Sequence, residues 1–134
     1  MSKLSAFLHP ATQHLEQEII ISDRFLDEKG NPAPFKIRAL RQDENEALVK
    51  QYTIPGKGGA PGKLDQMGYS RGVIVAATIE PDFSSKEMCE AYGTLDPAEV
   101  PGRMLMAGEY AKLSNAILQL SGFKEDVGAE VKNS

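Results

Sequence analysis

Two apolar runs near the N-terminus have the pattern of β-strands. Residues 16–22 contain three consecutive isoleucines, whose β-branched side chains favour an extended backbone. Residues 35–40 alternate apolar and polar side chains, which predicts a half-buried strand with Phe35, Ile37 and Ala39 facing inward. Because residues 27–34 between them are rich in turn-forming Gly, Asn and Pro, the sequence predicts an antiparallel hairpin with a long loop.

Most of the remaining chain has the signals of helices. Residues 42–52 place acids in the first turn, where the helix dipole favours them. Residues 84–93 begin with a capping box of Ser84 and Glu87 and end at Gly93, and a further helical start follows at Asp96 and Pro97. The last helix is predicted to open with residues 104–106 and to stop at Gly122. Its apolar stripe is formed by Met106, Tyr110, Leu113, Ile117 and Leu120.

Residues 64–79 fit either a helix or a strand. Their centre, residues 73–77, is apolar all round, so periodicity does not separate the two. The length favours a helix beginning near Leu64 or Tyr69, although Gly68 and Gly72 each weaken a helix by about 1 kcal/mol. The predicted fold is therefore α+β, a small N-terminal antiparallel hairpin or sheet packed on a C-terminal bundle of about four helices. We expect a single domain over residues 1–134, with an ordered core at about 16–123, a flexible N-terminal arm and a flexible C-terminal tail.

Composition narrows the class of protein. The chain has 134 residues, which suits one domain, and its single cysteine, Cys89, fits a reducing cytoplasm. A net charge of −4 makes nucleic acid and anionic membrane surfaces poor partners. No apolar run approaches the length of a membrane span, and the N-terminus lacks the apolar region of a signal peptide.

Two strings resemble catalytic motifs but lack the required context. Residues 68–72 match G-x-S-x-G around Ser70, yet that nucleophile needs a later histidine, and both histidines, His9 and His14, lie upstream. Residues 56–63 suggest a phosphate-binding loop in which Lys63 would contact phosphate. Leu64 replaces the hydroxyl that would hold Mg²⁺, and Pro61 removes an amide donor. The sequence favours a helical Ser70 and a mobile surface loop.

Other reactive side chains do not form a recognisable site. His14, Glu16 and Glu18 would project from one side of an early strand and could hold a metal, but a solvated strand face is the favoured interpretation. Cys89 beside Met88 is expected to pack as a small hydrophobe. We therefore predict no catalytic, cofactor-binding or metal-binding residues, and a protein that works by binding. Met104, Leu105 and Met106 are the candidate partner-binding residues, because methionine adapts to varied surfaces; a core role for all three is the alternative.

Several strings, taken in order, carry a resemblance to a known family. They are SDRF (22–25), PFKIR (34–38), ENEAL (44–48), PDF (81–83), AYG (91–93), DPAEVPG (96–102) and AGEY (107–110). Together they resemble the XkdN-like phage tail assembly chaperones of Bacillus-type prophages. The resemblance extends over roughly residues 4–126, and the loop at 56–63 lies outside the matching strings.

The resemblance implies a non-enzymatic assembly role. Chaperones of this kind bind the tape measure protein, keep it from aggregating and help tail tube subunits assemble around it. It also implies a protein of the bacterial host cytoplasm that is absent from the finished particle, with weak self-association. The competing hypotheses are a structural tail component and a small nucleotide-binding protein that uses the 56–63 loop.

Overall fold

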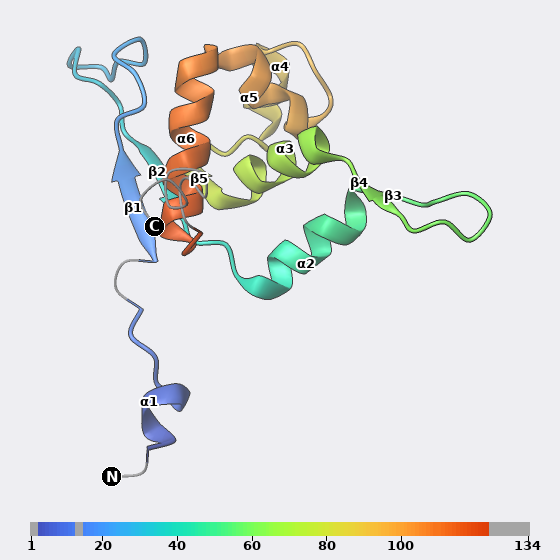
Figure 1. Cartoon of the computed structure of the whole chain (residues 1–134). Coiled ribbons are helices and arrows are strands. Elements are labelled where there is room, and N and C mark those ends of the chain that lie inside the picture. The colour runs from blue at the N-terminus through green and yellow to red at the C-terminus, as the bar shows by residue number, and fades with distance from the viewer. Residues whose placement is uncertain (1–2, 13–14, 124–134) are drawn as a thin grey trace, which may run out of the picture.

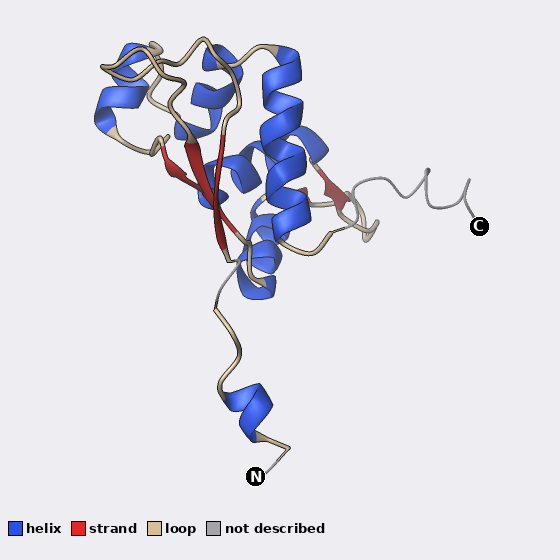
Figure 2. Ribbon diagram, turned by 90° about the vertical axis from the view of Figure 1, so that its left-hand side faces the viewer, coloured by secondary structure: helices blue, strands red, loops and turns tan. Residues whose placement is uncertain are grey.

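The computed structural model describes residues 3–12 and 15–123 (Figure 1). A short N-terminal helix, α1 (Ser5–Leu8), lies apart from the rest of the described chain, and the other elements form one body with a small sheet beside several helices (Figures 1 and 2). The predicted α+β class is confirmed. The predicted C-terminal tail from residue 124 onward lies outside the described residues.

The sheet has three antiparallel strands in the order β1-β2-β5. β1 (Glu16–Ile19) pairs with β2 (Phe35–Arg38), as predicted, with Ile19 opposite Phe35. Phe35 and Ile37 point into the core, while Ala39 lies beyond the end of β2 and is half-buried. β1 is shorter than the predicted 16–22, because the chain leaves the ladder after Ile19 and turns Ile21 into the core at 5% exposure.

The third strand, β5 (Thr78–Glu80), was not predicted. It pairs with β2 and directly follows α3 (Gln66–Ala77). The ambiguous segment is therefore a helix at its centre, and its two ends are strands. Its first residue, Leu64, belongs to β4 (Lys63–Leu64), which pairs with β3 (Thr53–Ile54).

The helix α3 lies against α2 (Gln42–Gln51) through its glycines. A Cβ atom built on Gly68 would lie 2.5 Å from Cδ1 of Tyr52, and one on Gly72 would lie 2.8 Å from Cε2 of the same ring. The glycines that weaken α3 as an isolated helix thus allow the Tyr52 ring to approach its backbone. Asp65 caps the helix by accepting a hydrogen bond from the Gly68 amide at 3.1 Å.

The C-terminal half holds α4 (Lys86–Ala91), a 3₁₀ turn η1 (Pro97–Glu99), α5 (Val100–Met104) and α6 (Ala107–Leu120). The predicted Ser84–Glu87 capping box is wrong by one residue, since Ser85 is the N-cap and accepts from the Met88 amide. The predicted stops at Gly93 and Gly122 are correct. Both residues have positive φ, and the amide that follows each bonds back to the helix.

The last helix begins later than predicted. Met104 ends α5, Leu105 lies between the helices and Met106 is the N-cap of α6, because the chain bends after Leu105. Leu113 and Ile117 of the predicted stripe are fully buried, whereas Met106 is 61% exposed. The core that α6 shares with the sheet and α3 consists of Phe35, Ile37, Ile74, Ala77, Phe83, Val100, Leu113 and Ile117, together with less completely buried neighbours.

Candidate functional site

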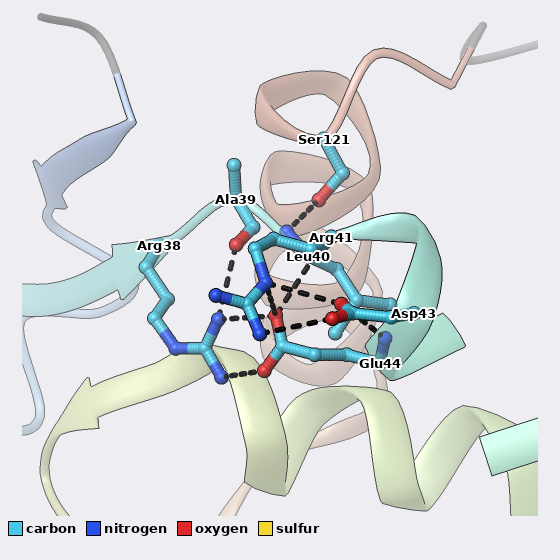
Figure 3. A network of polar contacts seen from close by, with 7 residues as sticks. All are labelled: Arg38, Ala39, Leu40, Arg41, Asp43, Glu44 and Ser121. Carbon is cyan, nitrogen blue, oxygen red and sulfur yellow. Dashed lines mark hydrogen bonds and ion pairs between the residues drawn. The ribbon is translucent and has the colours of Figure 1, made fainter. Parts of the chain in front are cut away.

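An arginine–glutamate pair joins the sheet to the start of α2 (Figure 3). Arg38 at the end of β2 donates two hydrogen bonds to the Glu44 carboxylate, at 2.9 and 2.6 Å. The same carboxylate accepts from the Arg41 amide at 3.0 Å and so caps the helix. The hydrogen bonds from Arg38 lower the pKa of Glu44 to about 2. This site is a structural clamp, in which both carboxylate oxygens of Glu44 accept hydrogen bonds.

A second pair of the same design holds the start of α6. Arg24 donates to both oxygens of Glu109, at 3.0 and 2.5 Å, and to the Met104 carbonyl at 3.1 Å. Glu109 also accepts from the Met106 amide at 2.8 Å. The hydrogen bond from Arg24, followed by those from Ser22 and Met106, lowers the pKa of Glu109 to about 2. We refer to the Arg38–Glu44 and Arg24–Glu109 pairs as the two clamps.

The structure places Ser70 inside a helix. Residues 68–72 all belong to α3, so the strand-to-helix turn that exposes a nucleophile in the G-x-S-x-G motif does not occur at Ser70. Its hydroxyl lies 3.5 Å from the Tyr110 hydroxyl. Of the two histidines, His9 lies at the end of the detached α1, and His14 lies outside the described residues. The helical interpretation of Ser70 is confirmed.

The glycine-rich loop is the tip of a two-stranded hairpin. Residues 55–62 connect β3 to β4 and project from the body of the protein (Figure 1). A turn closes the tip, with the Ala60 amide donating to the Lys57 carbonyl at 3.1 Å. A phosphate-binding loop runs from a strand directly into the N-terminus of a helix, whereas here β4 and Asp65 separate the loop from α3. The hairpin therefore lacks the arrangement that cradles phosphates.

Only two of the three candidate metal ligands lie within the described residues. Glu16 and Glu18 lie on β1, where Glu16 pairs with Lys36 at 3.5 Å, and His14 is outside the described residues. Across residues 3–12 and 15–123, no group of three or more His, Cys, Asp and Glu side chains could hold a metal ion. Cys89 is buried, as expected, and its thiol lies 3.7 Å from the Phe83 carbonyl oxygen.

The three candidate partner-binding residues have different surroundings. Met106 is 61% exposed, Met104 is half-buried against the core, and Leu105 is buried at 8% exposure. Only Met106 therefore presents most of its side chain to a partner, while Leu105 anchors the link between α5 and α6.

A surface groove with a volume of about 320 Å³ lies between α3, α5 and α6. More apolar than polar surface lines it, and we call it the helix groove. Its lining residues are Gln66, Met67, Ser70, Arg71, Gly102 and Tyr110. Sequence reasoning missed this site, because the lining residues come from three separate elements and share no motif.

Apolar side chains are also exposed on the N-terminal arm. Phe7 is 80% exposed and Leu8 is 63% exposed, on the face of a single helical turn. Exposed aromatic and aliphatic side chains on one short segment are typical of a surface that contacts another protein. The arm and the helix groove are thus two apolar surfaces that a partner could contact.

Comparison with known proteins decides the family. The family model of the phage XkdN-like tail assembly chaperone protein matches residues 4–133, nearly the whole chain. The chain belongs to the XkdN-like tail assembly chaperone family. The resemblance found in the sequence is therefore confirmed, and the family gives a general role in phage tail assembly. Its description is that of a chaperone rather than an enzyme.

Two proteins of Bacillus subtilis (strain 168) are similar to this member of the XkdN-like family. The phage-like element PBSX protein XkdN is 37% identical over 139 residues, which cover 97% of this chain and 93% of that protein. The uncharacterized protein YqbN is 36% identical over 130 residues, covering 92% and 87% of the two chains. A crystal structure of YqbN matches with a TM-score of 0.75 at 34% identity, over 92% of this chain and 99% of that one.

The described helices of this XkdN-like chain include none that is both long and apolar enough to cross a lipid bilayer.

Proposed function

We propose that this protein binds the tape measure protein during phage tail assembly, keeps it from aggregating and assists the assembly of the tail tube around it. Membership of the tail assembly chaperone family is the observation that carries the proposal. Family membership gives the class of work, and the exposed apolar surfaces suggest how the work is done.

A chaperone of this kind needs apolar contact surface on a body that does not itself aggregate. Phe7, Met67 and Met106 are 80%, 66% and 61% exposed. They are spread over separate elements of a chain with a net charge of −4, and that charge keeps free copies apart. Such a surface suits the apolar stripes that a long helical tape measure protein exposes before assembly.

The proposal includes the place and the lifetime of the complex. The protein acts without catalysis in the host cytoplasm, associates weakly with further copies of itself along the tape measure protein, and leaves before the particle is complete. Met106, with the half-buried Met104 beside it, remains a proposed contact, and Leu105 holds the two in position from the core.

Co-expression tests the proposal. The tape measure protein encoded in the same phage genome is produced in bacteria with and without this chain. We expect a higher soluble yield and a complex that purifies through a tag on either partner. An unchanged yield with no complex would contradict the function. A mass-spectrometric inventory of purified particles separates the alternative, because a structural tail component would be present there.

A further inference from the structure

The helix groove is open at the surface and has space that residues 3–12 and 15–123 leave unfilled. A Cβ atom built on Gly102 of α5 meets no atom within 4 Å. Met67 on the opposite side of the groove is 66% exposed. Since a methionine side chain is flexible and polarizable, it can adjust to the side chains of an incoming helix.

The charges around the groove are not balanced. A second hollow adjoins the first through Arg71 and Gly102 and is also lined by Glu99 and Arg103. Arg103 is occupied, because it pairs with Glu99 at 3.0 Å and donates to the Tyr92 and Gly93 carbonyls. Arg71 is exposed, and its side chain forms no ion pair or hydrogen bond within residues 3–12 and 15–123. Within the described part of the chain, the positive charge of Arg71 is therefore unpaired where the two hollows meet.

We propose that the helix groove docks an amphipathic helix of the tape measure protein, with its apolar face on Met67 and Tyr110 and an acidic side chain paired with Arg71. This inference rests on the proposed function and names the surface and the chemistry of the segment it binds. Helices bind in grooves through apolar side chains spaced three and four residues apart, and a flanking charge fixes their register.

The acidic net charge of the chain does not oppose this arrangement. Electrostatic repulsion between exposed charges is screened beyond about 10 Å at 0.1 M salt. Binding therefore depends on the side chains that line the groove and not on the net charge of the chain. Arg71 is the local charge there, and an acid on the partner gains an ion pair that nothing in the described chain already provides.

The test uses variants that fill or reverse the groove without touching the core. Gly102→Trp occupies the open space, Met67→Asp removes apolar contact, and Arg71→Glu reverses the charge. Gly108→Trp is the matched control, because a Cβ atom at Gly108 also meets nothing within 4 Å. Gly108 is two residues from Tyr110 on α6 and so lies on the far side of that helix. Circular dichroism and urea unfolding confirm that each variant is folded.

Each variant is co-expressed with the tape measure protein of the same phage genome, and affinity is measured on a series of peptides of about 25 residues that span it. We expect Gly102→Trp, Met67→Asp and Arg71→Glu each to weaken binding by about tenfold or more, with Gly108→Trp within about twofold of wild type. The peptides that bind most tightly should carry Asp or Glu beside an apolar helical stripe, and Arg71→Lys should retain binding.

Two results would overturn the inference while leaving the proposed function intact. One is that the wild-type chain forms the complex and the folded groove variants bind with an affinity within about twofold of wild type. The other is tight binding by peptides that lack carboxylates. A wild-type chain that binds neither the peptides nor the full-length tape measure protein would instead contradict the proposed function, and the groove assignment with it.

Discussion

At the scale of single residues, two glutamates do the same work in different parts of the chain. Glu44 and Glu109 are each the third residue of a helix, and each accepts from the backbone amide that precedes that helix. Each also accepts two hydrogen bonds from the guanidinium group of one arginine, Arg38 for Glu44 and Arg24 for Glu109. The N-cap positions hold Arg41 and Met106, which lack a capping oxygen, so the glutamates provide the helix start as well as the link to the sheet side.

Because of the two clamps, the free energy of unfolding should depend on pH in the acid range. A carboxyl whose pKa is lowered on folding stabilises the folded state above its unfolded pKa, and that contribution is lost as the pH falls toward the folded pKa. The pKa of both glutamates falls from 4.5 to about 2. We therefore expect the free energy of unfolding to decline from about pH 5 toward pH 2, measured by urea unfolding at a series of pH values.

Glu44→Gln tests the first clamp alone. It should lower the free energy of unfolding at pH 7 by about 1 kcal/mol, after allowance for solvent screening, and reduce the loss at acid pH. Glu46→Gln removes a carboxylate from the same helix without touching Arg38 and serves as the control. Equal pH profiles for the two variants would contradict the role of the clamp.

Gly68 is a second residue whose role depends on its surroundings. A methyl group there would lie 2.5 Å from Oδ2 of Asp65, the N-cap residue, and 2.5 Å from Cδ1 of the Tyr52 ring. Although alanine favours a helix, Gly68→Ala should destabilise the protein by about 1–3 kcal/mol, because one of these contacts must move. Gly108→Ala, the same change in open space, should be neutral or slightly stabilising in urea unfolding. A stabilised Gly68→Ala would show that the α2–α3 contact is loose.

At the scale of elements, local signals predicted some helix ends correctly, while the short strands β3, β4 and β5 were not predicted. Asp96 caps η1 by accepting from the Ala98 amide, and Gly93 and Gly122 end their helices, as their residue types indicate. β5 was not predicted, because the extended conformation of Thr78–Glu80 depends on pairing with β2, about forty positions earlier in the chain. The hydrophobic pattern of the segment itself does not indicate a strand. The two-residue strands β3 and β4 are likewise defined by each other.

The hairpin of β3 and β4 gives a prediction about nucleotides. Its tip has two glycines with positive φ, Gly58 and Gly59, and closes on itself through the Lys57 carbonyl. Since the loop does not lead into a helix N-terminus, millimolar ATP or GTP with Mg²⁺ should leave the melting temperature unchanged in a thermal shift assay. A clear increase that Lys57→Ala or Lys63→Ala abolishes would restore the nucleotide-binding hypothesis.

At the scale of the whole molecule, the sequence predicted the fold class and the family but not the binding surfaces. The α+β class, the first strand pair and the family followed from periodicity and ordered strings. The helix groove did not, because Met67, Gly102 and Tyr110 come together only when α3, α5 and α6 pack. The Arg24–Glu109 clamp joins residues 85 positions apart, which no local pattern reveals. The burial of Leu105 was not predictable either, since the bend between α5 and α6 is what turns that residue into the core. A partner-binding role for residues 104–106 stays a prediction.

The arm and the groove lie on separate parts of the molecule, so their contributions to binding should be separable. Phe7 and Leu8 belong to a four-residue helix that places no residue in the buried core. Changing both to serine should therefore leave the free energy of unfolding within about 0.5 kcal/mol of wild type. The same change should lower the yield of soluble tape measure protein on co-expression, because two linked contacts hold a long partner better than one.

Leu95→Ser provides the control for the arm variant, as Leu95 is 99% exposed at another place on the surface. If the arm binds independently of the groove, combining Phe7→Ser and Leu8→Ser with Gly102→Trp should lower the soluble yield further than either change alone. An arm variant that leaves the yield unchanged would assign binding to the body of the protein. One that lowers the free energy of unfolding would mean that the arm packs on that body.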